Sequence, residues 1–179
     1  MPVVLGRNVM TREEMQQLLD YNAWAHARVW SCINTLTDEQ FNRNVGYAFE
    51  HIRGQVTHCM NVERRWAVRL TGQQPPERLT TDDAPSIAAV RQLWDVLQAE
   101  TRALLDGLTE DDLEQYIEYD VPQRGGKKRD LRSDIVRHMI NHGTDHRAQI
   151  LAMLYMLGAK TLEQDLLIYI WEQQDQLEG

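Results

Sequence analysis

The segment SDIVRHMINHGTDHRAQILAMLYML, residues 133–157, carries the pattern that decides the fold. Apolar residues recur along it at the three- and four-residue spacing of an α-helix, and Gly158 follows as a helix terminator. His138, His142 and His146 are four residues apart, so each lies about 40° around the helix from the last and about 6 Å along it. Because apolar residues share this side, we expect it to face a core.

Three other segments show the same periodicity and predict long amphipathic helices at residues 12–36, 48–71 and 86–107. Thr11 and Glu14 can form a capping box before the first, and Ser86 is a typical N-cap for the third. Phe49 is among the residues expected on the apolar face of the second helix. Four long helices predict an all-α four-helix bundle, and the alternative is an irregular α-domain that pairs with a second copy.

The connections carry local signals of their own. Residues 72–85 contain three of the five prolines, so they predict a long connection that is not a continuous helix. The stretch YIEYDVPQRGGKKRDLR, residues 116–132, predicts a small hairpin before the last long helix, and residues 161–174 predict a C-terminal helical segment. We expect a single domain over residues 1–179, because two domains would each have a small core.

Composition limits the classes of function. A net charge of −8 and a pI near 5.2 argue against nucleic acid as the main partner, and the basic cluster at residues 124–129 is typical of a solvated turn. No stretch reaches the length of an apolar membrane span, and the N-terminal apolar run is short for a signal peptide, so we expect a cytoplasmic protein without membrane contact. Cys32 and Cys59 fall in different predicted helices and indicate reduced thiols.

The histidines have two interpretations. Two histidines four residues apart can reach one metal ion from the same side of a helix, and a third ligand must then come from another helix. His58 lies near the buried stripe of the second predicted helix, whereas His51 lies near its start, so His58 is the better candidate. The alternative is surface histidines, or core histidines bonded to a carbonyl or carboxylate. Spacing alone leaves both open.

Four longer segments are LLDYNAWAHARVWSCINTLTDEQF (18–41), IRGQVTHCMNVERRW (52–66), HMINHGTDHRAQI (138–150) and GAKTLEQDLLIYIWE (158–172). In content and order they resemble the DinB/YfiT-like superfamily of metal-binding four-helix bundles, over nearly the whole chain. The resemblance implies an up-down-down-up bundle in which three histidines hold a divalent ion. Carried over residue by residue, it assigns the ligands to His58, His142 and His146 and leaves His138 beside the site.

The superfamily that this chain resembles includes thiol-dependent transferases, isomerases and hydrolases. The resemblance therefore implies a zinc or nickel ion with an open position, where a low-molecular-weight thiol or water loses its proton more readily. The implied function is a metal-dependent S-transferase acting on a small-molecule substrate, with no catalytic side chain assigned beyond the ligands. The alternative is a non-catalytic metal-binding or stress-response bundle, expected to be dimeric.

Further residues have paired interpretations. Arg147 could bind a carboxylate of the substrate or thiol cofactor, or it could be exposed or paired with Glu63. Glu63 could orient that arginine or a ligand imidazole, or it could be an ordinary solvated charge. His26 has no recognisable ligand set around it in the sequence. Trp30 or Trp171 could contribute to an apolar homodimer surface.

Overall fold

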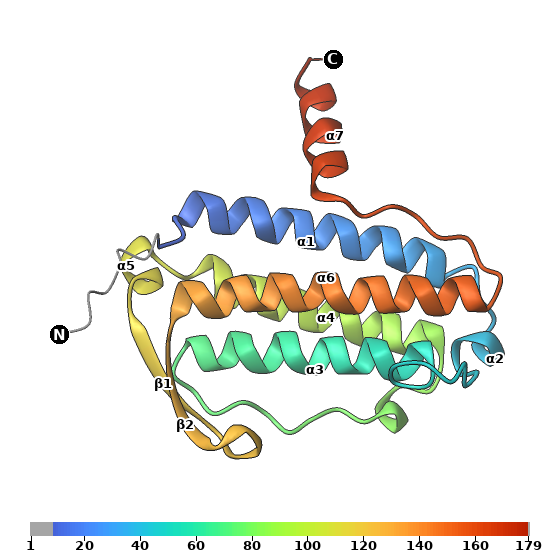
Figure 1. Ribbon diagram of the computed structural model, residues 1–179, viewed down its shortest axis with the longest axis horizontal. Coiled ribbons are helices and arrows are strands. Elements are labelled where there is room, and N and C mark those ends of the chain that lie inside the picture. Colours follow the sequence, from blue (N-terminus) through green and yellow to red (C-terminus); the bar gives the residue numbers. More distant parts are fainter. Residues whose placement is uncertain (1–8, 179) are drawn as a thin grey trace.

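The computed structural model describes residues 9–178, and its largest elements are the helices α1 (Arg12–Ile33), α3 (Ile52–Leu70), α4 (Ile87–Asp106) and α6 (Arg132–Met156). In Figure 1, α1 and α6 run in one direction and α3 and α4 in the other, which confirms the up-down-down-up four-helix bundle. Because α3 and α4 are consecutive and parallel, the chain must return along the whole bundle between them. The proline-containing connection makes this return.

The helix starts follow from local hydrogen bonding. Thr11 and Glu14 form the expected capping box at α1, and the Ser86 hydroxyl accepts from the backbone of Ala89 at α4. The last long helix, expected from about residue 133, begins at Arg132, and Ser133 is buried inside its first turn.

The start of α3 also differs from the prediction, because the helix begins at Ile52 rather than at residue 48. Ala48 and Glu50 have φ values of 50° and 67°, a left-handed conformation that interrupts a right-handed helix. His51 is the N-cap, and its ring nitrogen accepts from the backbone of Gly54 at 2.8 Å. Phe49 therefore lies before the helix and is 44% exposed, so its assignment to the apolar face of α3 was wrong.

The shorter elements are α2 (Asp38–Phe41), η1 (Thr81–Asp83), α5 (Glu110–Leu113), β1 (Tyr116–Val121), η2 (Pro122–Arg124), β2 (Gly126–Leu131) and α7 (Leu166–Glu178). The antiparallel strands β1 and β2 form the predicted hairpin, with Tyr116 opposite Leu131 and Val121 opposite Gly126. The C-terminal helix begins at Leu166, later than predicted, and α7 projects away from the bundle (Figure 1). No helix within residues 9–178 is both long and apolar enough to cross a membrane.

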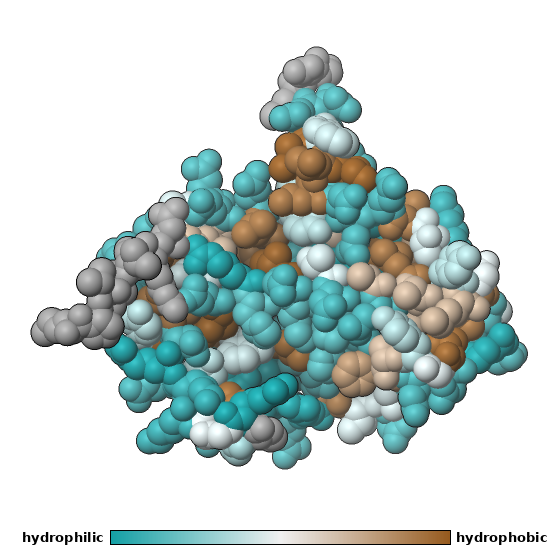
Figure 2. Space-filling view, viewed as in Figure 1, coloured by the Kyte–Doolittle hydropathy of each residue, from teal (hydrophilic) through white to brown (hydrophobic). Residues whose placement is uncertain are grey.

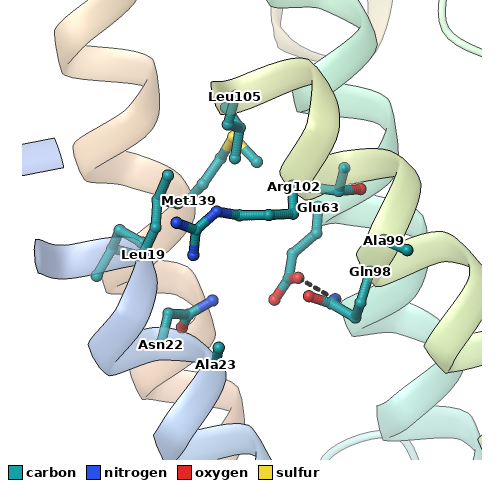
Figure 3. Close-up of a pocket in the computed structure, with 11 residues that line it drawn as sticks. Leu19, Asn22, Ala23, Glu63, Gln98, Ala99, Arg102, Leu105 and Met139 are labelled. Carbon is teal, nitrogen blue, oxygen red and sulfur yellow. Dashed lines mark hydrogen bonds between the residues drawn. The ribbon is translucent and has the colours of Figure 1, made fainter. Parts of the chain in front are cut away.

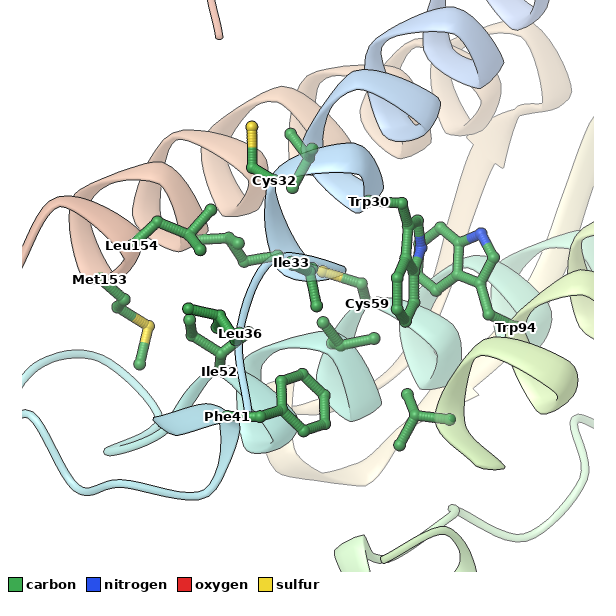
Figure 4. Close-up of a cluster of buried hydrophobic side chains, with 14 of the residues drawn as sticks. Trp30, Cys32, Ile33, Leu36, Phe41, Ile52, Cys59, Trp94, Met153 and Leu154 are labelled. Carbon is green, nitrogen blue, oxygen red and sulfur yellow. The ribbon is translucent and has the colours of Figure 1, made fainter. Parts of the chain in front are cut away.

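Two apolar clusters fill the ends of the bundle. One contains Phe41, Ile52 and Met153 together with the packed rings of Trp30 and Trp94 (Figure 4), whose centroids are 5.7 Å apart. Trp30 is only 2% exposed, so the expectation that it lies on a dimer surface is wrong. The other cluster lies at the opposite ends of the same four helices and is built from such residues as Met15, Leu70, Leu105, Leu113 and Val136.

A polar layer separates the two clusters. Buried polar side chains occupy the middle turns of the helices, where neither cluster has a member; they include Asn22, His26, Glu63, Thr101 and Arg147. Because a buried polar group must find a partner, this layer restricts how the helices can be aligned. The histidine face of α6 lies at the same level.

Candidate metal centre

Three histidines meet between α3 and α6. The Nε2 atoms of His58 and His142 are 3.2 Å apart, and the potential ligand atoms of His58, His142 and His146 all lie within 4.8 Å of one another. Zinc–nitrogen bonds of about 2.0–2.1 Å in a tetrahedral site place two ligand nitrogens about 3.3 Å apart. The structure thus brings together the three residues that the resemblance assigned as ligands, in a group that could hold a divalent ion.

Two glutamines orient His146. Its Nδ1–H can donate to Oε1 of Gln149 at 3.0 Å, and Nε2 of Gln55 donates to the same oxygen at 2.8 Å and also contacts Nδ1. With Nδ1 engaged in this way, Nε2 is the nitrogen left to bind an ion. Sequence analysis missed both glutamines. Their positions, three residues before His58 and three after His146, were the only signal available.

Burial keeps the His58 and His142 imidazoles neutral. Desolvation is the main cause that lowers the pKa of His58 to about 4, and the neighbouring His146 and Arg78 also lower it. Desolvation is also the main cause that lowers the pKa of His142 to about 3, with a smaller contribution from the neighbouring histidines. Both rings are therefore unprotonated at neutral pH, the form in which imidazole binds metals.

The cluster leaves one polar atom unsatisfied. Within the described part of the chain, Nδ1 of His142 is buried and has no hydrogen-bond partner. An unsatisfied buried group of this kind costs about 1–3 kcal/mol. The packing of the three imidazoles therefore carries a free-energy cost at His142.

The surroundings of the cluster are mainly aromatic. Phe49 stacks on His58 with ring centroids 4.3 Å apart, a contact that sequence analysis missed because Phe49 was placed inside the helix. His138 lies 5.7 Å from His142 between centroids and packs edge-on against Trp66, outside the group of three. Over residues 9–178, no fourth His, Cys, Asp or Glu joins the group. An ion there would keep an open coordination position.

Comparison with known proteins identifies the family of this chain. The model of the DinB family matches residues 9–177. The chain belongs to the DinB family. It is 24% identical to "Protein DinB" of Bacillus subtilis (strain 168) over 162 residues, which cover 87% of this chain and 92% of that protein.

The crystal structure of a DinB-like protein from Bacillus cereus ATCC 10987 has the same fold. It superposes with a TM-score of 0.62 at 20% sequence identity, covering 87% of this chain and 98% of that one. The DinB/YfiT-like bundle inferred from the sequence motifs is therefore confirmed.

Arg147, which follows the candidate ligand His146 in this DinB-family chain, points away from the three histidines. It is 0% exposed, so the interpretation as an exposed arginine is wrong. Its guanidinium donates to Oδ1 of Asn22, to Oγ1 of Thr144 at 3.0 Å and to Oε1 of Gln164 at 2.6 Å. Because its donors are engaged by protein acceptors, Arg147 is not available to a cofactor carboxylate at the histidine cluster.

Glu63 is the carboxylate of the polar layer. At 3% exposure it is not the solvated charge that was one interpretation, and it accepts hydrogen bonds from His26 at 3.0 Å and from Gln98. Burial alone would raise the pKa of Glu63, but His26, Gln98 and Arg147 together hold it below its ordinary value. Burial also lowers the pKa of His26, so the charge that balances Glu63 is that of Arg147. Sequence analysis did not pair His26 with Glu63.

A separate cavity of about 240 Å³ lies between α1 and α4, and Asn22, Glu63 and Thr101 of the polar layer line it. Figure 3 shows Glu63 and Gln98 at one side of it, Asn22 at another and the Arg102 side chain across the opening. None of the three clustered histidines lines this cavity. The candidate metal centre and the α1–α4 cavity are therefore distinct features of the bundle.

Proposed function

We propose that this DinB-family chain is a metal-dependent enzyme that transfers a low-molecular-weight thiol to a small electrophilic substrate. The observation that carries the proposal is the group of three imidazoles, His58, His142 and His146, with no fourth His, Cys, Asp or Glu beside them among the described residues. Imidazole ligands suit zinc and nickel, and three of them with an open position are typical of catalytic rather than structural zinc.

The residues of this chain have defined tasks in that proposal. When bound, the ion would supply a Lewis acid that lowers the pKa of a thiol or water. Gln149 and Gln55 hold the His146 ring in one orientation, so that its ligand nitrogen needs no rearrangement. Phe49 covers one face of His58, which limits access of bulk water to that side.

A non-catalytic metal-binding bundle is the alternative. A protein side chain in the fourth coordination position would favour it, because structural zinc sites are closed. The described residues offer no such side chain next to the three histidines. This absence favours the enzyme, and the thiol titration below separates the two functions.

The first experiment measures metal content. Protein purified without added metal should contain about one divalent ion per chain, and His142→Ala should lose it. His138→Ala is the matched control, because His138 lies one turn away on the same helix but outside the group. If the wild type contains no ion and His142→Ala binds zinc as well as the wild type does, the metal centre is refuted.

The second experiment tests the thiol. Titration of the cobalt-substituted protein with several small thiols should change its visible absorption spectrum, since a thiol at the open position alters the ligand field. A metal-loaded protein whose spectrum no thiol changes would exclude the transferase and leave the non-catalytic metal-binding protein. The thiol that binds is then used to screen small electrophiles for a substrate.

We also propose that two copies pair through α7. Figure 2 shows apolar side chains at the base of the projecting helix, and Leu167 and Trp171, one turn apart, are 57% and 56% exposed. A projecting helix that exposes a large aromatic and a leucine on one face is unfavourable in water unless another surface covers it. Sedimentation equilibrium should give a dimer for the wild type and a monomer for Trp171→Ser; a monomeric wild type would refute the pairing.

A further inference from the structure

A small pocket begins at His58 and continues along α3. Its volume is about 150 Å³, and its lining includes His58, Asn61 and the three arginines Arg65, Arg69 and Arg78. His58, Arg65 and Arg69 are separated by seven and four residues on one helix, so their side chains project from the same face. The candidate metal centre and the arginines therefore lie along one continuous surface.

Within the part of the chain that the structure describes, the three arginines have no acidic partner. Within residues 9–178, no carboxylate forms a salt bridge with Arg65, Arg69 or Arg78. This is unusual in a chain with a net charge of −8, whose other arginines often pair with carboxylates. Arg64, the immediate neighbour of Arg65, is an example, since it lies 3.9 Å from Glu100 on α4.

The chain holds these like charges together through its own contacts. Asn61 bonds Leu79 twice, accepting from its backbone nitrogen at 2.7 Å and donating to its carbonyl oxygen at 2.8 Å, which fixes the connection beside α3. Arg65 donates to the carbonyl oxygen of Pro76 in the same connection. Arg69 lies over the ring of Trp66 at 4.9 Å. Desolvation and the neighbouring arginines lower the pKa of Arg65 and of Arg69, so the cluster is electrostatically unfavourable without an anion.

We propose that this pocket binds the anionic group, a carboxylate or a phosphate, of the molecule whose other end reacts at His58, His142 and His146. This inference rests on the proposed function and adds to it the chemical class of the ligand. Guanidinium groups suit such an anion because they bind carboxylate and phosphate oxygens through two parallel hydrogen bonds. Cα atoms seven residues apart on a helix, as in His58 and Arg65, are about 10 Å apart, a span within reach of a small molecule.

The test measures anion binding without relying on activity. Isothermal titration of the full chain with inorganic phosphate and with succinate reports the dissociation constants, and the comparison of the two identifies the preferred anion. Arg69→Gln and Arg78→Gln should each raise the dissociation constant of the preferred anion by about 10-fold to 100-fold, as expected from the loss of one charge-assisted hydrogen bond. Arg64→Gln, the matched control, should bind it as the wild type does. Thermal melting of each variant verifies that it folds.

Three results would overturn the anion pocket. The first is a wild type that binds neither anion at about 10 mM, roughly the weakest affinity of interest for a small ligand. The others are Arg69→Gln and Arg78→Gln variants that bind the anion as the wild type does, or a loss of anion affinity in Arg64→Gln equal to theirs. His142→Ala separates this inference from the proposed function. If it loses the metal and still binds the anion, the pocket is independent of the ion and the inference holds. If the wild type contains no ion and His142→Ala binds zinc as well as the wild type does, the metal enzyme is refuted even where the anion binds, and with it the role of the pocket in holding a reacting molecule.

Discussion

Gly143 provides a sharp test of how α1 and α6 pack. It lies on α6 between the ligand positions His142 and His146, with a backbone that any residue can adopt in a helix. A Cβ added there would lie 2.8 Å from Oδ1 of Asn22 and 3.0 Å from Nη1 of Arg147. These two atoms form the hydrogen bond that joins α1 to the buried guanidinium. Gly143→Ala therefore cannot fit unless that bond is displaced.

Two effects of opposite sign decide the result. Replacing glycine by alanine inside a helix stabilises it by about 1 kcal/mol. Displacing a buried hydrogen bond to a charged group costs about 1.5–3 kcal/mol. The net expectation is that the free energy of unfolding falls by about 0.5–2 kcal/mol. For a chain of this size, that is a decrease in Tm of about 1–8 °C.

Thermal melting by circular dichroism, with and without zinc, measures this change. Gly107→Ala is the control, because the added Cβ would meet only ordinary contacts at 3.5 Å and 3.6 Å at the C-cap of α4. That variant should keep or raise the Tm. A Gly143→Ala protein that melts above the wild type would refute the close contact between α1 and α6, since helix propensity alone predicts an increase.

Three further predictions concern the buried ionisable groups. Because the pKa values of His58 and His142 are lowered to about 4 and about 3, protons would compete with an ion at these candidate ligands only in more acidic solution. Two histidines with ordinary pKa values would lower the zinc affinity about 70-fold between pH 7 and pH 5.5. Chelator competition should therefore show a far smaller loss, and a full 70-fold loss would contradict the lowered pKa values. Glu63→Gln removes the charge that balances the buried arginine and should lower the free energy of urea unfolding by about 3–5 kcal/mol, whereas the exposed Glu100→Gln should change it by at most about 1 kcal/mol. Equal effects of the two variants would argue against a buried charge pair. Burial raises the pKa of the Cys59 thiol, so a disulfide reagent should label it only as the protein unfolds, and prompt labelling of the native protein would show that the thiol is accessible.

The bundle itself was predictable because its signals are local. Apolar periodicity marked all four long helices, and the capping residues at Thr11 and Ser86 marked two of their starts within a residue. The start of α3 was not predictable in this way. Ala48 and Glu50 adopt left-handed φ values although neither is a glycine, so their residue types did not predict the turn. The misplacement of Phe49 followed from that single error.

The candidate site was predictable only in part. The spacing of His142 and His146 put both on one helix face, the buried stripe of the second predicted helix favoured His58, and the resemblance to a known superfamily set His138 apart. The partners of these rings lie on other turns and other helices. Gln55 and Gln149 had no distinguishing pattern in the sequence, and each acquires a role only because α3 and α6 pack side by side.

The amino-acid sequence by itself determined the four helices, their order and the family, because helix formation and family motifs depend on residues close together in the chain. The tertiary structure decided which polar groups meet. It buried Arg147 against α1 instead of leaving it beside the histidines, and it brought Arg78 from the long connection to Arg65 and Arg69 on α3. The reason is that burial and charge pairing depend on distances across the bundle, and a one-dimensional pattern contains no such distances.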